Sequence, residues 1–106
     1  MSDRVFVRYV GNADFHDGSI VDVQHDTDAI RVRVRGASGK IYVAEFPAGK
    51  PVRLNRPVGM LLYSLCELRA DPPFRRFVFA NWHENDDAAL EIDAETLNVH
   101  DDAESQ

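Results

Sequence analysis

Apolar and polar residues alternate along several stretches of this chain, and a period of two is typical of β-strands. The alternation is clearest at residues 30–35, where Ile30, Val32 and Val34 are each followed by an arginine. Other segments rich in β-branched and aromatic residues are 4–10, 19–26, 40–46, 74–82 and 89–100. Turn signals separate most of them. The pattern predicts an all-β fold with at most one short helix, an antiparallel meander of about six or seven strands forming a small sandwich or half-open barrel.

The register of the first hairpin follows if Thr27 and Asp28 form its two-residue turn. The apolar pairs are then Val23 with Val32 and Val21 with Val34, and the polar pairs are Asp22 with Arg33 and Gln24 with Arg31. Apolar and polar pairs agree in one register, which supports the assignment. Continued through a four-residue loop at 36–39, the same logic pairs Ile41 with Val34 and Val43 with Val32, and places Tyr42 beside Arg33.

Two segments are harder to assign. Residues 59–69 combine helix-favouring Leu, Met and Glu with a strand-like context, so a strand is favoured and a helix stays the alternative. Near the C-terminus, Leu90, Ile92 and Ala94 share one face, whereas Leu97 and Val99 fall on the other. One extra residue would restore the phase, so we predict a β-bulge near residues 95–96.

A length of 106 residues suits one domain, predicted to span residues 1–100 and to be followed by a flexible acidic tail at 101–106. Cys66 is the only cysteine and lies in an apolar stretch, so we expect a buried inert thiol and a reducing compartment. The N-terminal residues resemble no signal peptide, and no run approaches the roughly 20 apolar residues of a membrane span. These features favour a cytoplasmic, bacterial protein.

Each of the four histidines is followed directly by an acid. Adjacent residues of a strand point to opposite faces, but His16-Asp17 and His83-Glu84 lie in expected turns and could converge on one ion. A metal-dependent hydrolase using these four residues is therefore the alternative hypothesis. No metal motif, nucleophile elbow or phosphate loop is present, so the sequence favours a non-enzymatic protein without a cofactor. In this interpretation Phe15 anchors the core, and Asp17 accepts backbone N–H bonds in its turn.

The formal net charge of −6 is unevenly distributed. Residues 29–76 hold ten of the twelve basic residues, whereas residues 77–106 hold nine acids and no lysine or arginine. An acidic chain is a poor general binder of nucleic acid. A local basic stripe of Arg31, Arg33 and Arg35 is nevertheless possible; the alternative is that neighbouring strands neutralise it, for example Asp22 beside Arg33.

The acidic C-terminal part suggests a surface for a protein partner, and we expect either a monomer or a homodimer. Its candidate residues are Glu91, Asp93 and Glu95 on one strand, Glu84, Asp86 and Asp87 in the turn before it, and Trp82. Trp82 could equally be a core aromatic residue. Such a face would attract a basic protein, for example a nuclease with a positive substrate groove, and would speed encounter at low salt. The alternative is a solvated surface with no partner.

The order of elements also carries a resemblance. "FHDGSIVDV" leads into a hairpin, "KIYVAEF" follows, and "ALEIDAETLNV" closes the chain. This order, over most of residues 15–100, resembles small bacterial β-rich domains of unknown function that begin with a Phe-His-Asp turn, some of them described as toxin-immunity proteins. The resemblance implies a compact non-enzymatic β-domain and carries over no catalytic residue. The segment at 4–10 lies outside it.

Overall fold

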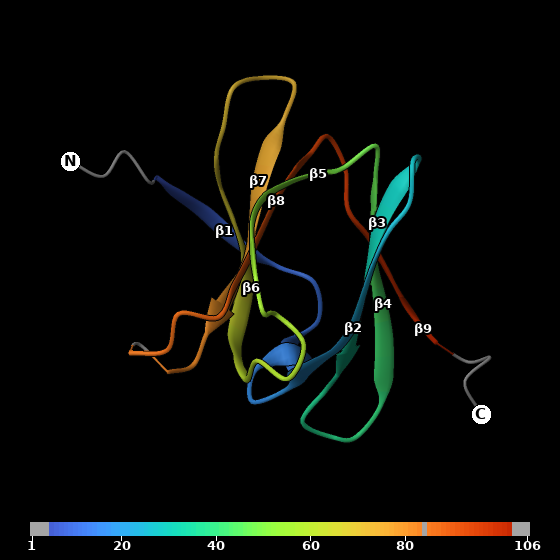
Figure 1. Cartoon of the computed structure of the whole chain (residues 1–106), viewed down its shortest axis with the longest axis vertical. Helices are drawn as coiled ribbons and strands as arrows, with labels where there is room; N and C mark the ends of the chain where they lie inside the picture. Colours follow the sequence, from blue (N-terminus) through green and yellow to red (C-terminus); the bar gives the residue numbers. More distant parts are fainter. Residues whose placement is uncertain (1–4, 84, 103–106) are drawn as a thin grey trace.

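The computed structural model describes residues 5–83 and 85–102, and these form two antiparallel sheets that pack face to face (Figure 1). The five-stranded sheet has the order β1 (Phe6–Val10), β6 (Leu62–Arg69), β7 (Arg75–Asn81), β8 (Ala89–Ala94), β5 (Lys50–Asn55). The four-stranded sheet has the order β2 (Ser19–His25), β3 (Ala29–Arg35), β4 (Ile41–Pro47), β9 (Asn98–Asp101). A short 3₁₀ turn, η1 (Ala13–Phe15), lies between β1 and β2. The predicted all-β fold is confirmed as an open sandwich, with nine strands in its described part instead of about six or seven.

The core fills the space between the inner faces of the sheets. Its largest fully buried side chains are Phe15, Phe46, Phe77, Phe79, Ile20, Ile30, Leu62, Leu65, Leu90, Ile92, Val32 and Val34. Phe46 of the four-stranded sheet meets Phe77 and Phe79 of the five-stranded sheet at ring-centroid distances of 5.2 and 6.0 Å. Aromatic contacts therefore join the two sheets directly.

The β2–β3 register confirms part of the hairpin prediction. Val23 lies opposite Val32, and Asp22 lies opposite Arg33. The expected pair of Val21 with Val34 is wrong, because the register shifts before Asp22 and Ile20 takes that place. The bulge turns Ile20 into the core, where it is almost fully buried.

The β3–β4 register differs from the prediction by one residue. Tyr42, not Ile41, lies opposite Val34, and the loop has five residues, 36–40. A shift of one residue exchanges the two faces of a strand. Tyr42 and Phe46 therefore enter the core together with Ala44, where they bury more apolar area than Ile41 and Val43 would.

Three features of the second half decide the topology. Residues 62–69 form a strand, β6, as favoured, and Cys66 is half-buried within it. β5, an edge strand with Pro51 near its start, was not predicted from the sequence. The predicted bulge at 95–96 is wrong: β8 ends at Ala94, and the chain crosses to the other sheet to form β9. The change of phase thus marks a change of sheet.

The predicted flexible tail begins within an ordered strand. Asp101 ends β9, and Asp102 accepts a hydrogen bond from Arg33 Nε at 2.7 Å. Residues 103–106 lie outside the described part of the chain. Within the described part, no helix has the length and apolar character needed to cross a membrane.

Candidate functional site

The turn that carries His16 and Asp17 meets the end of β7 through aromatic rings. The His16 ring lies 5.3 Å from the ring of Tyr63 and 5.3 Å from that of Trp82, and these two rings are 5.7 Å apart. We call His16, Tyr63 and Trp82 the aromatic cluster. Tyr63 is 46% exposed and Trp82 is 42% exposed, so Trp82 belongs to the surface rather than to the core.

Backbone contacts fix the aromatic cluster in place. The Trp82 backbone N–H donates to the Leu61 carbonyl at 2.9 Å, which ties the end of β7 to the start of β6. A register shift between Leu62 and Ser64 accompanies the outward orientation of Tyr63. His16 Nδ1–H donates to the Tyr63 carbonyl at 2.8 Å, so this ring is held by the backbone of β6.

The proposed metal ligands do not gather into a site in the described part of the chain. Nε2 of His16 is 3.9 Å from Oδ1 of Asp17, and both side chains are about half exposed. Residues 5–83 and 85–102 contain no group of three or more His, Cys, Asp or Glu residues placed to hold an ion. Glu84 lies outside the described residues, and His83 uses its backbone N–H to bond the Asn81 side chain. The arrangement around His16 suits apolar and stacking contacts better than metal binding.

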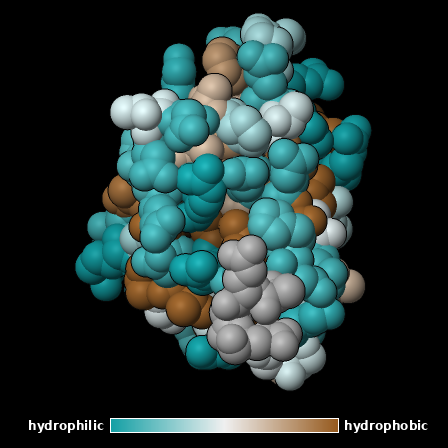
Figure 2. Space-filling model, turned by 90° about the vertical axis from the view of Figure 1, so that its right-hand side faces the viewer, coloured by the Kyte–Doolittle hydropathy of each residue, from teal (hydrophilic) through white to brown (hydrophobic). Residues whose placement is uncertain are grey.

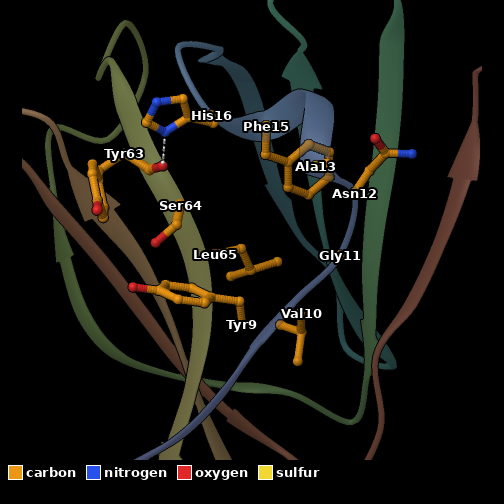
Figure 3. Close-up of a pocket in the computed structure, with 10 residues that line it drawn as sticks. All are labelled: Tyr9, Val10, Gly11, Asn12, Ala13, Phe15, His16, Tyr63, Ser64 and Leu65. Atoms are coloured by element: carbon orange, nitrogen blue, oxygen red, sulfur yellow. Dashed lines mark hydrogen bonds between the residues drawn. The ribbon is translucent and has the colours of Figure 1, made fainter.

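A cavity of about 430 Å³ opens beside the aromatic cluster (Figure 3). It is lined by Tyr9, Val10, Gly11, Asn12, Ala13, Phe15, His16, Tyr63, Ser64 and Leu65. Val10, Phe15 and Leu65 form an apolar floor, while the hydroxyl groups of Tyr9, Tyr63 and Ser64 point to the same side of β6 in the view. Apart from His16, the described residues that line the cavity include no acidic or basic side chain. It therefore suits an apolar or aromatic group bearing few charges.

The path of the backbone creates this cavity. β1 pairs with β6 only as far as Val10 opposite Leu65. The chain then turns at Gly11, whose φ of 79° favours glycine and where a Cβ would lie 2.8 Å from the Phe15 ring. It returns to β6 at Asp17, whose backbone N–H donates to the Leu62 carbonyl at 3.0 Å. Between Val10 and Asp17 the loop bends away from Tyr63 and Ser64, and the space left between the loop and β6 is the cavity.

The carboxylate that organises this loop is Asp14, not Asp17 as predicted. Asp14 accepts hydrogen bonds from the Ser38 hydroxyl at 2.6 Å, the Ser38 backbone N–H at 3.1 Å and the Tyr42 hydroxyl at 3.0 Å. The Ser38 hydroxyl bond is the main reason that the pKa of Asp14 lies below its ordinary value. Burial, followed by the bond to Asp14, raises the pKa of Tyr42. A Cβ at Gly36 would collide with the Asp14 carboxylate, which explains glycine there.

Asp14 therefore fastens η1 to the β3–β4 loop. Sequence reasoning missed it because Ser38 lies 24 residues away from Asp14. The only local signal is Asn12, whose side chain accepts the Asp14 backbone N–H at 2.8 Å.

The acids predicted to form a partner surface on β8 are paired within the sheet. Asp93 accepts two hydrogen bonds from Arg76 of β7, at 2.8 and 2.9 Å. Glu91 is only 5% exposed and lies 3.9 Å from Arg53 of β5. Glu95 is exposed but follows the end of β8. The flanking strands thus supply an arginine to each of Glu91 and Asp93, which leaves these two carboxylates less accessible than the sequence suggested.

The acidic turn before β8 is also compensated. The Asn81 side-chain amide is the main reason that the pKa of Asp86 is lowered. Asp87 forms an ion pair with Arg56, which also lies 3.9 Å from Asp86. Both acids therefore stabilise the turn that leads into β8, whose first residues are buried.

The basic stripe lies on the outer face of the four-stranded sheet, and hydrophilic residues dominate this side (Figure 2). Arg31 bonds Asp26 at 2.7 Å and Glu45 at 2.9 Å. Arg33 bonds Asp102 rather than Asp22, its neighbour in the register. Arg35, at the end of β3, is exposed. Two of the three arginines are thus neutralised across strands, which is the alternative that the sequence left open.

No protein-family model matches this chain, and no curated protein or solved structure shows significant similarity to it.

Proposed function

We propose that this protein is a non-enzymatic binding module that engages another protein through the aromatic cluster and the cavity beside it. The observation that carries the proposal is the exposure of two aromatic side chains: Tyr63, which lines a cavity of about 430 Å³, and Trp82, whose ring lies 5.7 Å from that of Tyr63. Tyrosine and tryptophan combine a large apolar area with a polar atom and are enriched among the residues that dominate protein interfaces.

The chemistry of the cavity indicates what the partner presents. Val10, Phe15 and Leu65 make part of its lining apolar, and three further lining residues carry hydroxyl groups. The described lining residues include no carboxylate or guanidinium. A protruding apolar or aromatic side chain of a protein would fill the floor, and polar atoms beside it would meet the rim. An immunity-type role, as described for some of the domains that the order of elements resembles, is one specific form of this function.

The distribution of charge supports the same surface indirectly. The ion pairs of Asp93, Arg31 and Arg33 are satisfied within the chain. A partner that used them would have to replace existing hydrogen bonds, which yields little net free energy. Contacts to the rings of Tyr63 and Trp82 would not have to replace such ion pairs. Binding there would therefore depend only weakly on ionic strength.

Site-specific photocrosslinking tests the proposal. A photoreactive phenylalanine analogue replaces Tyr63 or Trp82 in a tagged chain that is expressed in its native host. Val52 serves as the matched control, because it is 44% exposed on β5, at the opposite edge of the same sheet. We expect one crosslinked protein at Tyr63 and Trp82 and none at Val52.

Substitutions then separate the aromatic cluster from the acidic residues. The double substitution Tyr63→Ser with Trp82→Ala should reduce capture of that protein at least tenfold, whereas Glu95→Lys should leave it within twofold. Capture that survives the double substitution, or that is lost with Glu95→Lys or at high salt, would contradict the proposal and favour an electrostatic surface.

A further inference from the structure

The strand β1 leaves one edge of the five-stranded sheet open. It pairs with β6 on one side, and in the described part of the chain no strand pairs with its other side. Its side chains are unusually apolar for such an edge: Phe6 is 52%, Val7 37% and Tyr9 63% exposed, and Val5, just before the strand, is 42% exposed. An exposed apolar edge strand readily pairs with another strand.

The other three edges carry features that oppose pairing. β5 contains Pro51, which lacks a backbone N–H, together with Lys50 and Arg53. β2 has a register shift and ends in polar residues, and β9 has only four residues and ends in Asp101. β1 has no proline, and its charged residue, Arg8, pairs with Glu67 at 3.4 Å.

We infer that β1 pairs antiparallel with β1 of a second copy, which joins the two five-stranded sheets into one continuous sheet. This inference does not require the proposed function, although one contact residue, Tyr9, also lines the cavity. A two-fold axis perpendicular to the sheet matches the open N–H and C=O groups of one strand with those of its copy. The same axis keeps equivalent faces on the same side, so the Phe6–Tyr9 pair, with its rings 4.9 Å apart, would meet its own counterpart.

Charge and shape favour a second copy over an open-ended assembly. The one charged side chain of β1 is already compensated by Glu67, so the two copies bring little repulsion to the contact. A third copy could pair only with β5, β2 or β9, and these edges carry the features described above that oppose pairing. The association therefore closes at two copies instead of growing into a fibre.

The exposed area indicates a weak dimer. With about 200 Å² per aromatic side chain, the exposed parts of Phe6 and Tyr9 supply roughly 230 Å² per copy. Even with the valines and the backbone, the interface stays below the roughly 1,200–2,000 Å² of standard stable complexes. We therefore expect a dissociation constant on the order of 10–100 μM.

Sedimentation equilibrium on the full chain tests this, over roughly 1–500 μM. The wild type should shift from monomer to dimer in that range and show no larger species. Val7→Lys, on the β1 edge and outside the cavity lining, should weaken dimerisation at least tenfold. Val52→Lys places the same charge on the β5 edge and should leave the dissociation constant within twofold.

Hydrogen exchange gives a readout that does not depend on any variant. Protection of the amides of residues 5–10 should rise with wild-type concentration, while amides in β5 stay unchanged. Three results would each overturn the inference. The wild type could be monomeric throughout, Val7→Lys and Val52→Lys could have equal effects, or protection could rise elsewhere but not in β1. Capture of a heterologous partner through Trp82 is unaffected by Val7→Lys in this scheme, so failure of one proposal leaves the other intact.

Discussion

The aromatic cluster and the outer face of the four-stranded sheet are both surface regions. They differ in how many of their side chains find a partner within the same chain. On the outer face, Arg31 and Arg33 bond carboxylates of neighbouring strands. In the aromatic cluster, Tyr63 and Trp82 contact His16 and each other yet keep more than 40% of their area exposed. On the outer face, Arg31 and Arg33 are paired within the chain, whereas the aromatic cluster leaves apolar area uncovered.

This difference changes which residues count as candidates for binding. Charges attract attention in a sequence because they are unevenly distributed, but strands from other parts of the chain neutralise them here. Exposed aromatic area has no comparable internal partner, and covering it with a protein releases water at a favourable free energy. The same contrast should appear in how much single substitutions change the free energy of unfolding.

The largest difference in unfolding free energy is expected between substitutions of the buried Phe15 and of the exposed Trp82. Phe15 is 1% exposed, and Phe15→Ala should lower the free energy of unfolding by about 3–5 kcal/mol, because it removes a core ring and leaves a void. Trp82→Ala should cost only about 1 kcal/mol, since this ring makes edge contacts at the surface. Urea denaturation of both variants measures the difference. Equal costs would mean that Trp82 is a structural residue and would weaken its assignment to a binding surface.

A smaller loss of stability than for Phe15→Ala, but a larger one than for the surface charges, is expected when the buried carboxylate of Glu67 is removed. Glu67 is nearly buried and accepts a hydrogen bond from Arg75 at 2.8 Å. This bond, and then the charges of Arg75 and Arg8, hold the pKa of Glu67 below its ordinary value of 4.5. Glu67→Gln should therefore cost about 1.5–3 kcal/mol at pH 7, the range for hydrogen bonds to charged groups.

The pH dependence of that cost has a defined sign. Because the folded-state pKa of Glu67 is lowered, its contribution is fully present above pH 4.5 and is lost as the pH falls through the folded-state pKa. Denaturation of wild type and Glu67→Gln between pH 7 and pH 2 should show the two stabilities converging on the acid side. A constant difference across that range would show that the charge of Glu67 is not what stabilises the fold.

The smallest effect should come from the outer face. Arg33 is 43% exposed in its side chain and bonds Asp102. Arg33→Gln should change the free energy of unfolding by only about 0–1 kcal/mol, because solvent and salt screen such pairs. Thermal denaturation at low and high salt measures it. A cost well above this range would show that the outer face is a structural network and would remove the contrast with the aromatic region.

Much of the local structure could be predicted from the sequence, because alternation and turn residues act over a few positions. The pairs of β2 with β3 on either side of Val23 join residues that are no more than 11 positions apart in the sequence. The β3–β4 register was missed by one residue because loops of four and five residues both fit the local pattern. Burial of Tyr42 and Phe46 against the opposite sheet decided between them.

Apolar periodicity acts locally, so the amino-acid order is enough to predict that this chain forms strands, where most of them lie, and that Phe15 belongs to the core. The sheet that each strand joins and the side chains that meet depend instead on long-range packing. His16 and Tyr63 are 47 positions apart, and Arg33 and Asp102 are 69 apart. These contacts depend on β1 joining β6 and on the chain changing sheets after Ala94, and both follow from the packing of two complete sheets. The aromatic cluster and the neutralised charges are consequences of that packing, which no short stretch of the chain encodes.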